Sequence, residues 1–144
     1  MSETADEGRT WKPLDPARFE KMKAAFEKFG GEIDTSDEAL YAMWESNPDA
    51  LAETLDSKYI RMRPNPDTTT VFEEFIHTAQ FRTGEYGRLV EEFDQALALV
   101  KVEIKAQEKL LRNATKWGIP QAEIRRIQER LKLFQSAEER LGKE

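Results

Sequence analysis

Residues 70–80 read Thr70-Val71-Phe72-Glu73-Glu74-Phe75-Ile76-His77-Thr78-Ala79-Gln80, and they contain the only histidine of the chain. On a helical wheel of about 100° per residue, the apolar residues fill one arc and the polar residues the opposite arc. The polar arc contains, in order, Gln80, Glu73, His77 and Glu74. The pattern predicts a helix with one face in the core and two carboxylates, an imidazole and an amide on the other.

The spacing of Glu73 and His77 is typical of a metal site on a helix. The two residues are four apart, so their side chains are neighbours on the helix surface. Glutamate stands where the pattern His-Glu-x-x-His has its first histidine. An alternative remains open, because Thr70-x-x-Glu73 also fits a capping box that would use Glu73 to hold the backbone. Asp67 could cap the helix equally well.

A second carboxylate is predicted on the inward face of a later helix. A long helix is expected over 86–115, and its wheel places Glu103 and Gln107 within the apolar stripe, whereas Lys105 faces away. An ionised carboxylate that is buried without a partner costs several kcal/mol, so it is normally paired or metal-bound. The expected partner of Glu103 is His77, or a metal held by His77 and Glu73. Alternatively, a small rotation would bring Glu103 to the boundary, where an arginine or lysine could pair with it.

Composition excludes several classes of protein. The chain has 144 residues, which suits one domain, and it has no cysteine, so disulfides and thiolate metal sites are excluded. Its net charge of −6 argues against a broad nucleic-acid surface, although a local basic patch near residues 61–88 stays open. No apolar run is long enough for a membrane helix, and no secretory signal is recognised. We therefore expect a cytoplasmic location, with export by a non-classical route still open.

The chain is expected to form a predominantly helical α+β domain. Residues 1–12 are predicted to be a disordered lead-in, and 13–144 a single domain. A helix should begin at Asp15-Pro16 and end at Gly30-Gly31, and another should begin near Ser36 and stop before Asn47-Pro48. Residues 49–55 are expected to add a helical turn or two. Residues 59–63 alternate between apolar and polar types, as expected for a strand at the edge of a sheet, with Arg61 and Arg63 on one face.

The C-terminal half is expected to be a helical hairpin over 86–142. The segment 117–120 contains Gly118 and Pro120 and should break the two long helices, which would then pack antiparallel. The helix 120–142 carries an apolar edge of Ile124, Ile127, Leu131 and Phe134. This edge could pack internally or form a homodimer, and the sequence leaves both alternatives open.

The segments 72–84 and 103–110 together resemble one known group of domains. They are similar to the zincin-like metallopeptidase domains attached to phage head-morphogenesis proteins and bacterial polymorphic toxins. The resemblance covers roughly residues 30–118 and implies an edge strand at 58–63, a helix with His-Glu-x-x-His-x-x-Gln, and a second helix that supplies a glutamate ligand. Glu74 and His77 match the base and the second ligand, whereas Glu73 replaces the first histidine. Lys105 departs from the pattern of the second helix, which leaves Glu103 as the third ligand.

Two hypotheses about function follow. In the first, the chain is a metal-dependent hydrolase of peptide bonds. Glu73, His77 and Glu103 bind a divalent metal, of which zinc is the favoured candidate, and leave a fourth coordination position for water. Glu74 would take a proton from that water. Alternatively, Glu74 lies on the solvated surface of the helix, and His77 is a surface or core histidine beside a carboxylate.

Other residues are given supporting roles. Gln80 and Gln107 lie next to the ligands, or alternatively are buried amides bonded to the backbone. The strand with Arg61 and Arg63 would hold an extended peptide substrate by backbone hydrogen bonds. In the second hypothesis the same scaffold is an inactive module that binds a protein partner, with the hairpin 86–142 as its surface.

Overall fold

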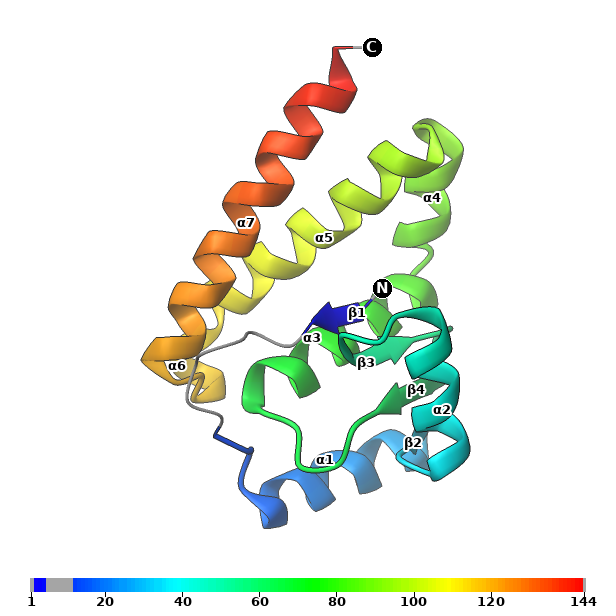
Figure 1. Cartoon of the computed structure of the whole chain (residues 1–144), viewed down its shortest axis with the longest axis vertical. Helices are drawn as coiled ribbons and strands as arrows, with labels where there is room; N and C mark the ends of the chain where they lie inside the picture. Colours follow the sequence, from blue (N-terminus) through cyan, green and yellow to red (C-terminus); the bar gives the residue numbers. More distant parts are fainter. Residues whose placement is uncertain (1, 5–11, 144) are drawn as a thin grey trace. The chain divides into compact units, whose positions relative to one another are not determined.

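The computed structural model describes residues 2–4 and 12–143 and has the predicted α+β class, with helices predominating over a small mixed sheet (Figure 1). The chain divides into two compact units, Met1–Thr78 and Ala79–Glu144. The division falls within one continuous helix, α3, which spans Thr68–Arg82. The single-domain organisation therefore stays a prediction. Among the described residues, no helix has the length and apolar character needed to cross a membrane.

The first two helices begin and end where the sequence predicts. Helix α1 spans Pro16–Lys28, and the side chain of Asp15 caps it by accepting a hydrogen bond from the backbone N–H of Arg18. The chain turns after this helix at Gly30, whose φ of 82° lies in the left-handed region that favours glycine. Helix α2 spans Asp37–Ser46, and Ser36 caps it by accepting from the N–H of Ala39.

Within the part of the chain that the structure describes, four strands form the sheet, in the order β1-β3-β4-β2. They are β1 (Ser2–Thr4), β2 (Glu32–Asp34), β3 (Ala50–Thr54) and β4 (Tyr59–Met62). Strand β3 is antiparallel to both β1 and β4, whereas β2 and β4 are parallel. The core of this unit lies between the sheet and its helices. It contains Leu14, Ile33, Ala52, Ile60, Met62 and Val71, with Phe19, Met22, Phe26 and Phe75 packed against them.

Three predictions about the sheet need correction. Strand β4 is not an edge strand, because β3 and β2 are bonded to its two sides. Residues 50–54 form β3 instead of helical turns; all five are buried, so the alternation that marks a half-buried strand is missing. Within the lead-in predicted to be disordered, Ser2–Thr4 forms β1. Residue 1 and residues 5–11 of that lead-in lie outside the described residues.

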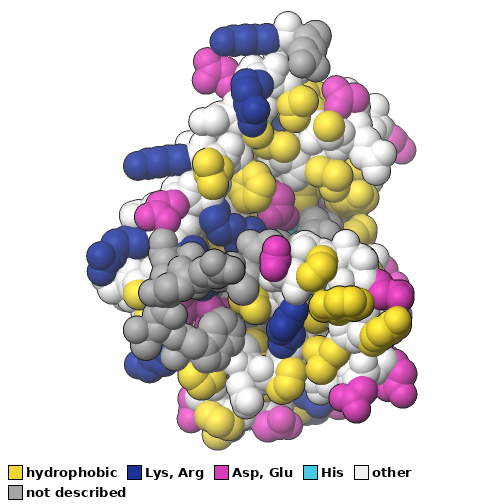
Figure 2. Space-filling model, viewed as in Figure 1, with side chains coloured by type: hydrophobic (Ala, Val, Ile, Leu, Met, Phe, Trp, Pro, Cys, Tyr) yellow, Lys and Arg dark blue, Asp and Glu magenta, His cyan; other side chains and the backbone are white. Residues whose placement is uncertain are grey.

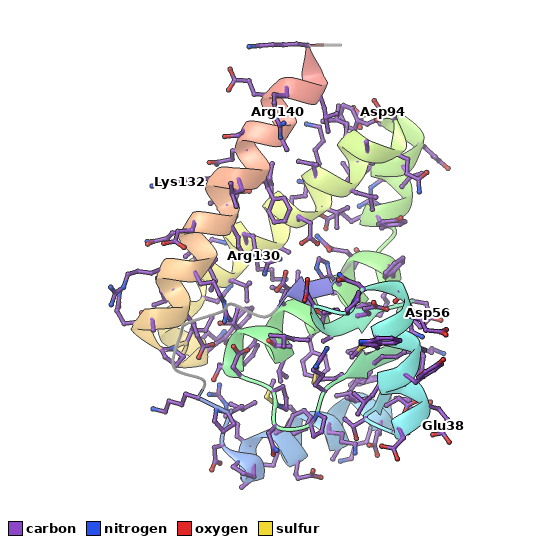
Figure 3. All side chains as sticks on the ribbon, viewed as in Figure 1. Glu38, Asp56, Asp94, Arg130, Lys132 and Arg140 are labelled. Atoms are coloured by element: carbon purple, nitrogen blue, oxygen red, sulfur yellow. The ribbon has the colours of Figure 1, made fainter. Side chains whose placement is uncertain are left out.

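The long helix predicted over 86–115 is divided in the structure. Helix α4 spans Glu85–Glu92, α5 spans Gln95–Arg112 and the short α6 spans Ala114–Trp117. The division falls at Phe93, whose backbone is extended, and Asp94 starts the next helix by accepting from the N–H of Leu97 at 3.0 Å (Figure 3). Aspartate at this position is a helix-start signal that the apolar periodicity concealed.

The helical hairpin itself is confirmed. Helix α7 spans Gln121–Gly142, and it packs side by side with α5 in the orange and yellow part of Figure 1. Gly118, with a φ of 67°, ends α6 and allows the chain to reverse before α7. The predicted break over 117–120 therefore lies where the glycine and proline place it.

Candidate metal centre

Helix α3 carries Glu73 and His77 as fully buried neighbours. Both side chains are 0% exposed, and the Nε2 atom of His77 lies 3.7 Å from an Oε1 atom of Glu73. That distance is too long for a strong hydrogen bond. It is close to the separation of about 3.3 Å that two ligands of one tetrahedral zinc ion have when each bond is about 2.0–2.1 Å. The pair is therefore placed as two ligands of one ion would be.

The start of α3 decides against the capping-box alternative for Glu73. The backbone N–H of Thr70 donates to the Oδ1 atom of Asp67 at 2.8 Å. In a capping box, Glu73 would have to reach back to that same N–H. Asp67 is thus the residue that caps this end of the helix, as the sequence allowed.

Glu103 and Gln107 lie on the buried face of α5, as the wheel predicts. Glu103 is 8% exposed and Gln107 is 0% exposed, and Lys105 is exposed. The fully buried apolar residues of α5 are Ala98, Val102, Ala106 and Leu110.

Glu73, His77 and Glu103 form a buried group that could hold a metal ion. Each offers one ligand atom, and these three atoms all lie within 4.8 Å of one another. Two carboxylates and one imidazole are a donor set that suits divalent metals such as zinc or manganese. The three residues selected from the sequence as ligands are therefore the three that the structure groups together.

Arg130 is a second partner of Glu103. On α7, the Nη2 atom of Arg130 lies 3.6 Å from the Oε2 atom of Glu103, on the side of α7 that faces α5 (Figure 3). The side chains of Arg130 and Glu103 are 18% and 10% exposed. The pairing of Glu103 with an arginine, which the sequence left open, is thus also present. It supplies part of the positive charge that a buried carboxylate requires.

Glu74 is fully buried, and the neighbouring sheet holds its carboxylate. The hydroxyl of Thr54, in β3, donates to the Oε1 atom of Glu74 at 2.9 Å and lies 3.2 Å from its backbone carbonyl oxygen. Glu74 precedes His77 by three residues on α3, so the two side chains are helix neighbours. Sequence reasoning missed Thr54 because it assigned residues 49–55 to helical turns.

The two glutamines fit the backbone-bonded alternative to different degrees. The amide Nε2 of Gln80 donates to the carbonyl oxygen of Val102 at 3.1 Å, both residues being in the second unit. Gln80 therefore has a structural role of its own, as the alternative reading expected. Gln107 is fully buried on the same face of α5 as Glu103.

Arg61 and Arg63 do not form a substrate strand. The Nη2 atom of Arg61 pairs with Glu53 at 2.7 Å. The guanidinium of Arg63 donates to the carbonyl oxygens of Ala50 and Pro48 at 2.7 and 2.8 Å. Both cations thus stabilise the sheet and the turn before β3. Because β4 is paired on both sides, it has no free backbone edge for a peptide, and this prediction is wrong.

An apolar surface pocket lies on the first unit. It has a volume of about 580 Å³ and is lined by Leu40, Tyr41, Trp44, Arg63 and Pro64. Figure 2 shows hydrophobic side chains gathered over α2, where Tyr41 and Trp44 are 61% and 59% exposed. None of the grouped metal-ligand residues lines this pocket, and it adds nothing to the chemistry of the buried group.

Comparison of the chain with family models, with curated proteins and with solved structures finds no match.

Proposed function

We propose that this chain is a zincin-like, metal-dependent hydrolase that acts on peptide bonds. Glu73, His77 and Glu103 bind one divalent ion, with zinc as the expected metal, and Glu74 is the general base. The proposal is supported above all by the grouping of three buried ligand atoms within 4.8 Å of one another. The resemblance to domains of phage and toxin proteins supports the same reaction class.

The charge of the group explains why a cation is expected there. Two ionised glutamates would place two negative charges among side chains that are at most 10% exposed. Burying such charges is costly unless cations or hydrogen bonds compensate them. A divalent ion compensates both carboxylates and takes the neutral form of the imidazole.

The number of ligands and the position of Glu74 are the basis for assigning metal binding to three residues and proton transfer to the fourth. Three protein ligands leave a coordination position for water, and a bound zinc ion lowers the pKa of that water. Glu74 lies outside the grouped ligands and is held by Thr54. A carboxylate in that place can accept a proton from water and pass it to the leaving amine of a cleaved peptide.

A second candidate function is favoured by the ion pair of Glu103 with Arg130. Because the two atoms are only 3.6 Å apart, the carboxylate has a partner even without a metal. In this alternative the chain is an inactive binding module, and the buried polar group is a structural network. The two candidates differ in whether the protein carries an ion.

Metal analysis of the protein, purified without chelator, tests the proposal. We expect about one zinc or manganese ion per chain, and a lower Tm after chelation, because a ligand bound only by the native state stabilises it by about 2.7 kcal/mol at a hundredfold excess over Kd. His77→Ala and Glu103→Gln should each lose the ion. The matched control is Glu108→Gln, which alters an exposed glutamate on the same helix as Glu103 and should keep it.

The contrary result is equally clear. A metal-free protein with a Tm that chelator and added zinc leave unchanged would reject the hydrolase and favour the binding module. Loss of the ion in Glu108→Gln as well as in Glu103→Gln would show that binding is not specific to the buried group.

A further inference from the structure

The strand β1 is an unusual occupant of the sheet. It contains only the three residues Ser2-Glu3-Thr4, and all three are polar types. It lies antiparallel along β3, with Ser2 opposite Glu53, Glu3 opposite Ala52 and Thr4 opposite Ala50. The register shifts between Glu3 and Thr4, so Leu51 of β3 is not matched. So short and irregular a pairing offers few interactions to keep it closed.

Without β1, the outer side of β3 would be an exposed sheet edge. The other side of β3 is paired with β4, with Ala52 opposite Met62 and Thr54 opposite Ile60. A sheet edge offers a row of backbone N–H and C=O groups, and an extended peptide can add to it as a further strand. Strand β1 therefore occupies the one place beside β3 where another extended chain could bind.

The same edge leads to the residue that holds Glu74. Ser2 is opposite Glu53, and the next residue of β3 is Thr54. The hydroxyl of Thr54 donates to Glu74 at 2.9 Å. Since a strand advances about 3.3 Å per residue, a bound peptide that continues one residue beyond the position of Ser2 would pass Thr54. A chain bound along β3 is thus directed toward the proposed base.

We propose that the outer edge of β3 binds an extended polypeptide in the antiparallel sense, and that Ser2–Thr4 occupies this edge as an internal competitor. The occupant is a segment of this same chain, and the partner that displaces it is a peptide main chain, recognised by backbone hydrogen bonds. The consequence for turnover rests on the proposed function: while β1 is paired, the substrate edge is closed. The binding itself needs no metal.

The test opens the edge within the full chain. The double variant Ser2→Pro/Glu3→Pro removes two consecutive backbone N–H groups, so it disrupts the pairing whichever of the two residues donates. Ser2→Ala/Glu3→Ala is the matched control that keeps both N–H groups. The probe is a fluorescein-labelled synthetic peptide with the sequence MSETADEGRTW of residues 1–11. Its binding is followed by fluorescence anisotropy in buffer that contains chelator.

We expect the proline variant to bind this peptide at least tenfold more tightly than the alanine variant or the unchanged chain. A peptide with proline at its second and third positions should not bind. Equal affinity for all three proteins, or no binding to a proline variant that retains its circular dichroism spectrum, would overturn the proposal.

A measurement on the unchanged chain covers the case in which the proline variant does not fold. Backbone amides of β3 that face β1 should exchange with deuterium at least tenfold faster than amides of β4 that face β3, because only the former are protected by β1. Equal exchange would make β1 a fixed part of the sheet and would overturn the proposal. Because chelator is present in the binding assay, failure of the metal site and failure of the peptide edge give separate results.

Discussion

Glu74 is the residue whose role differs most between the two candidate functions, the hydrolase and the binding module. Its carboxylate is fully buried and accepts a hydrogen bond from Thr54 at 2.9 Å. For a structural network, such a bond compensates for burial. For a hydrolase, the same bond fixes the orientation of a base beside His77. Replacement of Glu74 by its amide separates these roles, because the amide keeps nearly the same shape and loses the ability to accept a proton.

Glu74→Gln should retain the metal and lose turnover. General-base catalysis contributes about 10²–10⁴-fold to a rate, so we expect a fall of that size in cleavage of a quenched-fluorescent casein. Metal content, measured by mass spectrometry, should stay at about one ion per chain. A fully active Glu74→Gln protein would show that another residue is the base.

Thr54→Val is the control for indirect effects on Glu74. It removes the hydroxyl donor and keeps the shape of the side chain, so it should lower the free energy of unfolding by about 1–3 kcal/mol. The proton acceptor remains, and turnover per folded molecule should therefore fall less than in Glu74→Gln. A loss of turnover as large as that of Glu74→Gln would assign the effect to positioning instead of proton transfer.

At the scale of the elements, the sequence predicts helices well and strand neighbours poorly. The ends of α1 and α2 follow from Asp15, Ser36 and Gly30, because caps and positive-φ turns depend on local chemistry. The pairing order of strands depends on residues far apart in the chain, so β4 was placed at an edge although its sequence as a strand was recognised. Strand β3 is not predicted, because it is buried along its whole length and so lacks the alternation of apolar and polar residues that marks a half-buried strand.

The candidate ligands were predictable for a related reason. Glu73 and His77 belong to one helix, where spacing alone makes them neighbours, and Glu103 is identified by its place within an apolar stripe. Thr54 was not predictable, because its contact with Glu74 spans twenty residues and needs the sheet. The roles assigned to Arg61 and Arg63 failed together with the edge position of β4.

The parallel pair β2–β4 has a pH dependence of its own. The hydroxyl of Tyr59, in β4, donates to the Oδ2 atom of Asp34, in β2, at 2.7 Å. Hydrogen bonds from Ser36 and then Tyr59 hold the pKa of Asp34 below 3.8. The hydrogen bond to Asp34 is also the main cause that raises the pKa of Tyr59 from 10.0 to about 12.

The two shifts predict losses of stability at opposite ends of the pH range. The raised pKa of Tyr59 gives stability that is complete below pH 10 and is lost as the pH rises toward about 12. The lowered pKa of Asp34 gives stability that is present above pH 3.8 and is lost as the pH falls through its folded value. In Tyr59→Phe the loss of stability at alkaline pH should disappear, because no phenol is left to ionise. The loss at acidic pH should become smaller, because Asp34 no longer accepts a hydrogen bond from Tyr59. Both are read from the free energy of unfolding in urea from pH 3 to 12.

Tyr41→Phe is the matched control for this pH series. Tyr41 is 61% exposed on α2, and its replacement should leave both ends of the profile as in the unchanged chain. If the free energy of unfolding falls at alkaline pH by the same amount in Tyr59→Phe and in the unchanged chain, the hydrogen bond to Asp34 is not the cause of that fall.

At the scale of the whole molecule, the net charge of −6 and the apolar surfaces bear on which partners are reasonable. An acidic chain disfavours broad contact with nucleic acid. The exposed aromatic residues on α2 and the proposed peptide edge of β3 both suit polypeptide partners. These partners remain proposals, and so does a homodimer through residues 120–142.

The homodimer can be weighed against internal packing of the same helix. Ile127, in the middle of the apolar edge, is fully buried, and α7 packs on α5 within one chain. Of the large apolar residues on α7, Leu133 is the one with high exposure, at 70%, whereas a stable interface buries about 800 Å² on each partner. We therefore expect sedimentation velocity to give one species of 16.7 kDa from about 5 to 200 μM. A dimer with an association free energy of about −8.2 kcal/mol has a Kd of about 1 μM, so it would form over this range of concentration. A sedimentation coefficient that rises with concentration, and no longer rises in Leu133→Glu, would instead assign the edge of α7 to a contact between two copies.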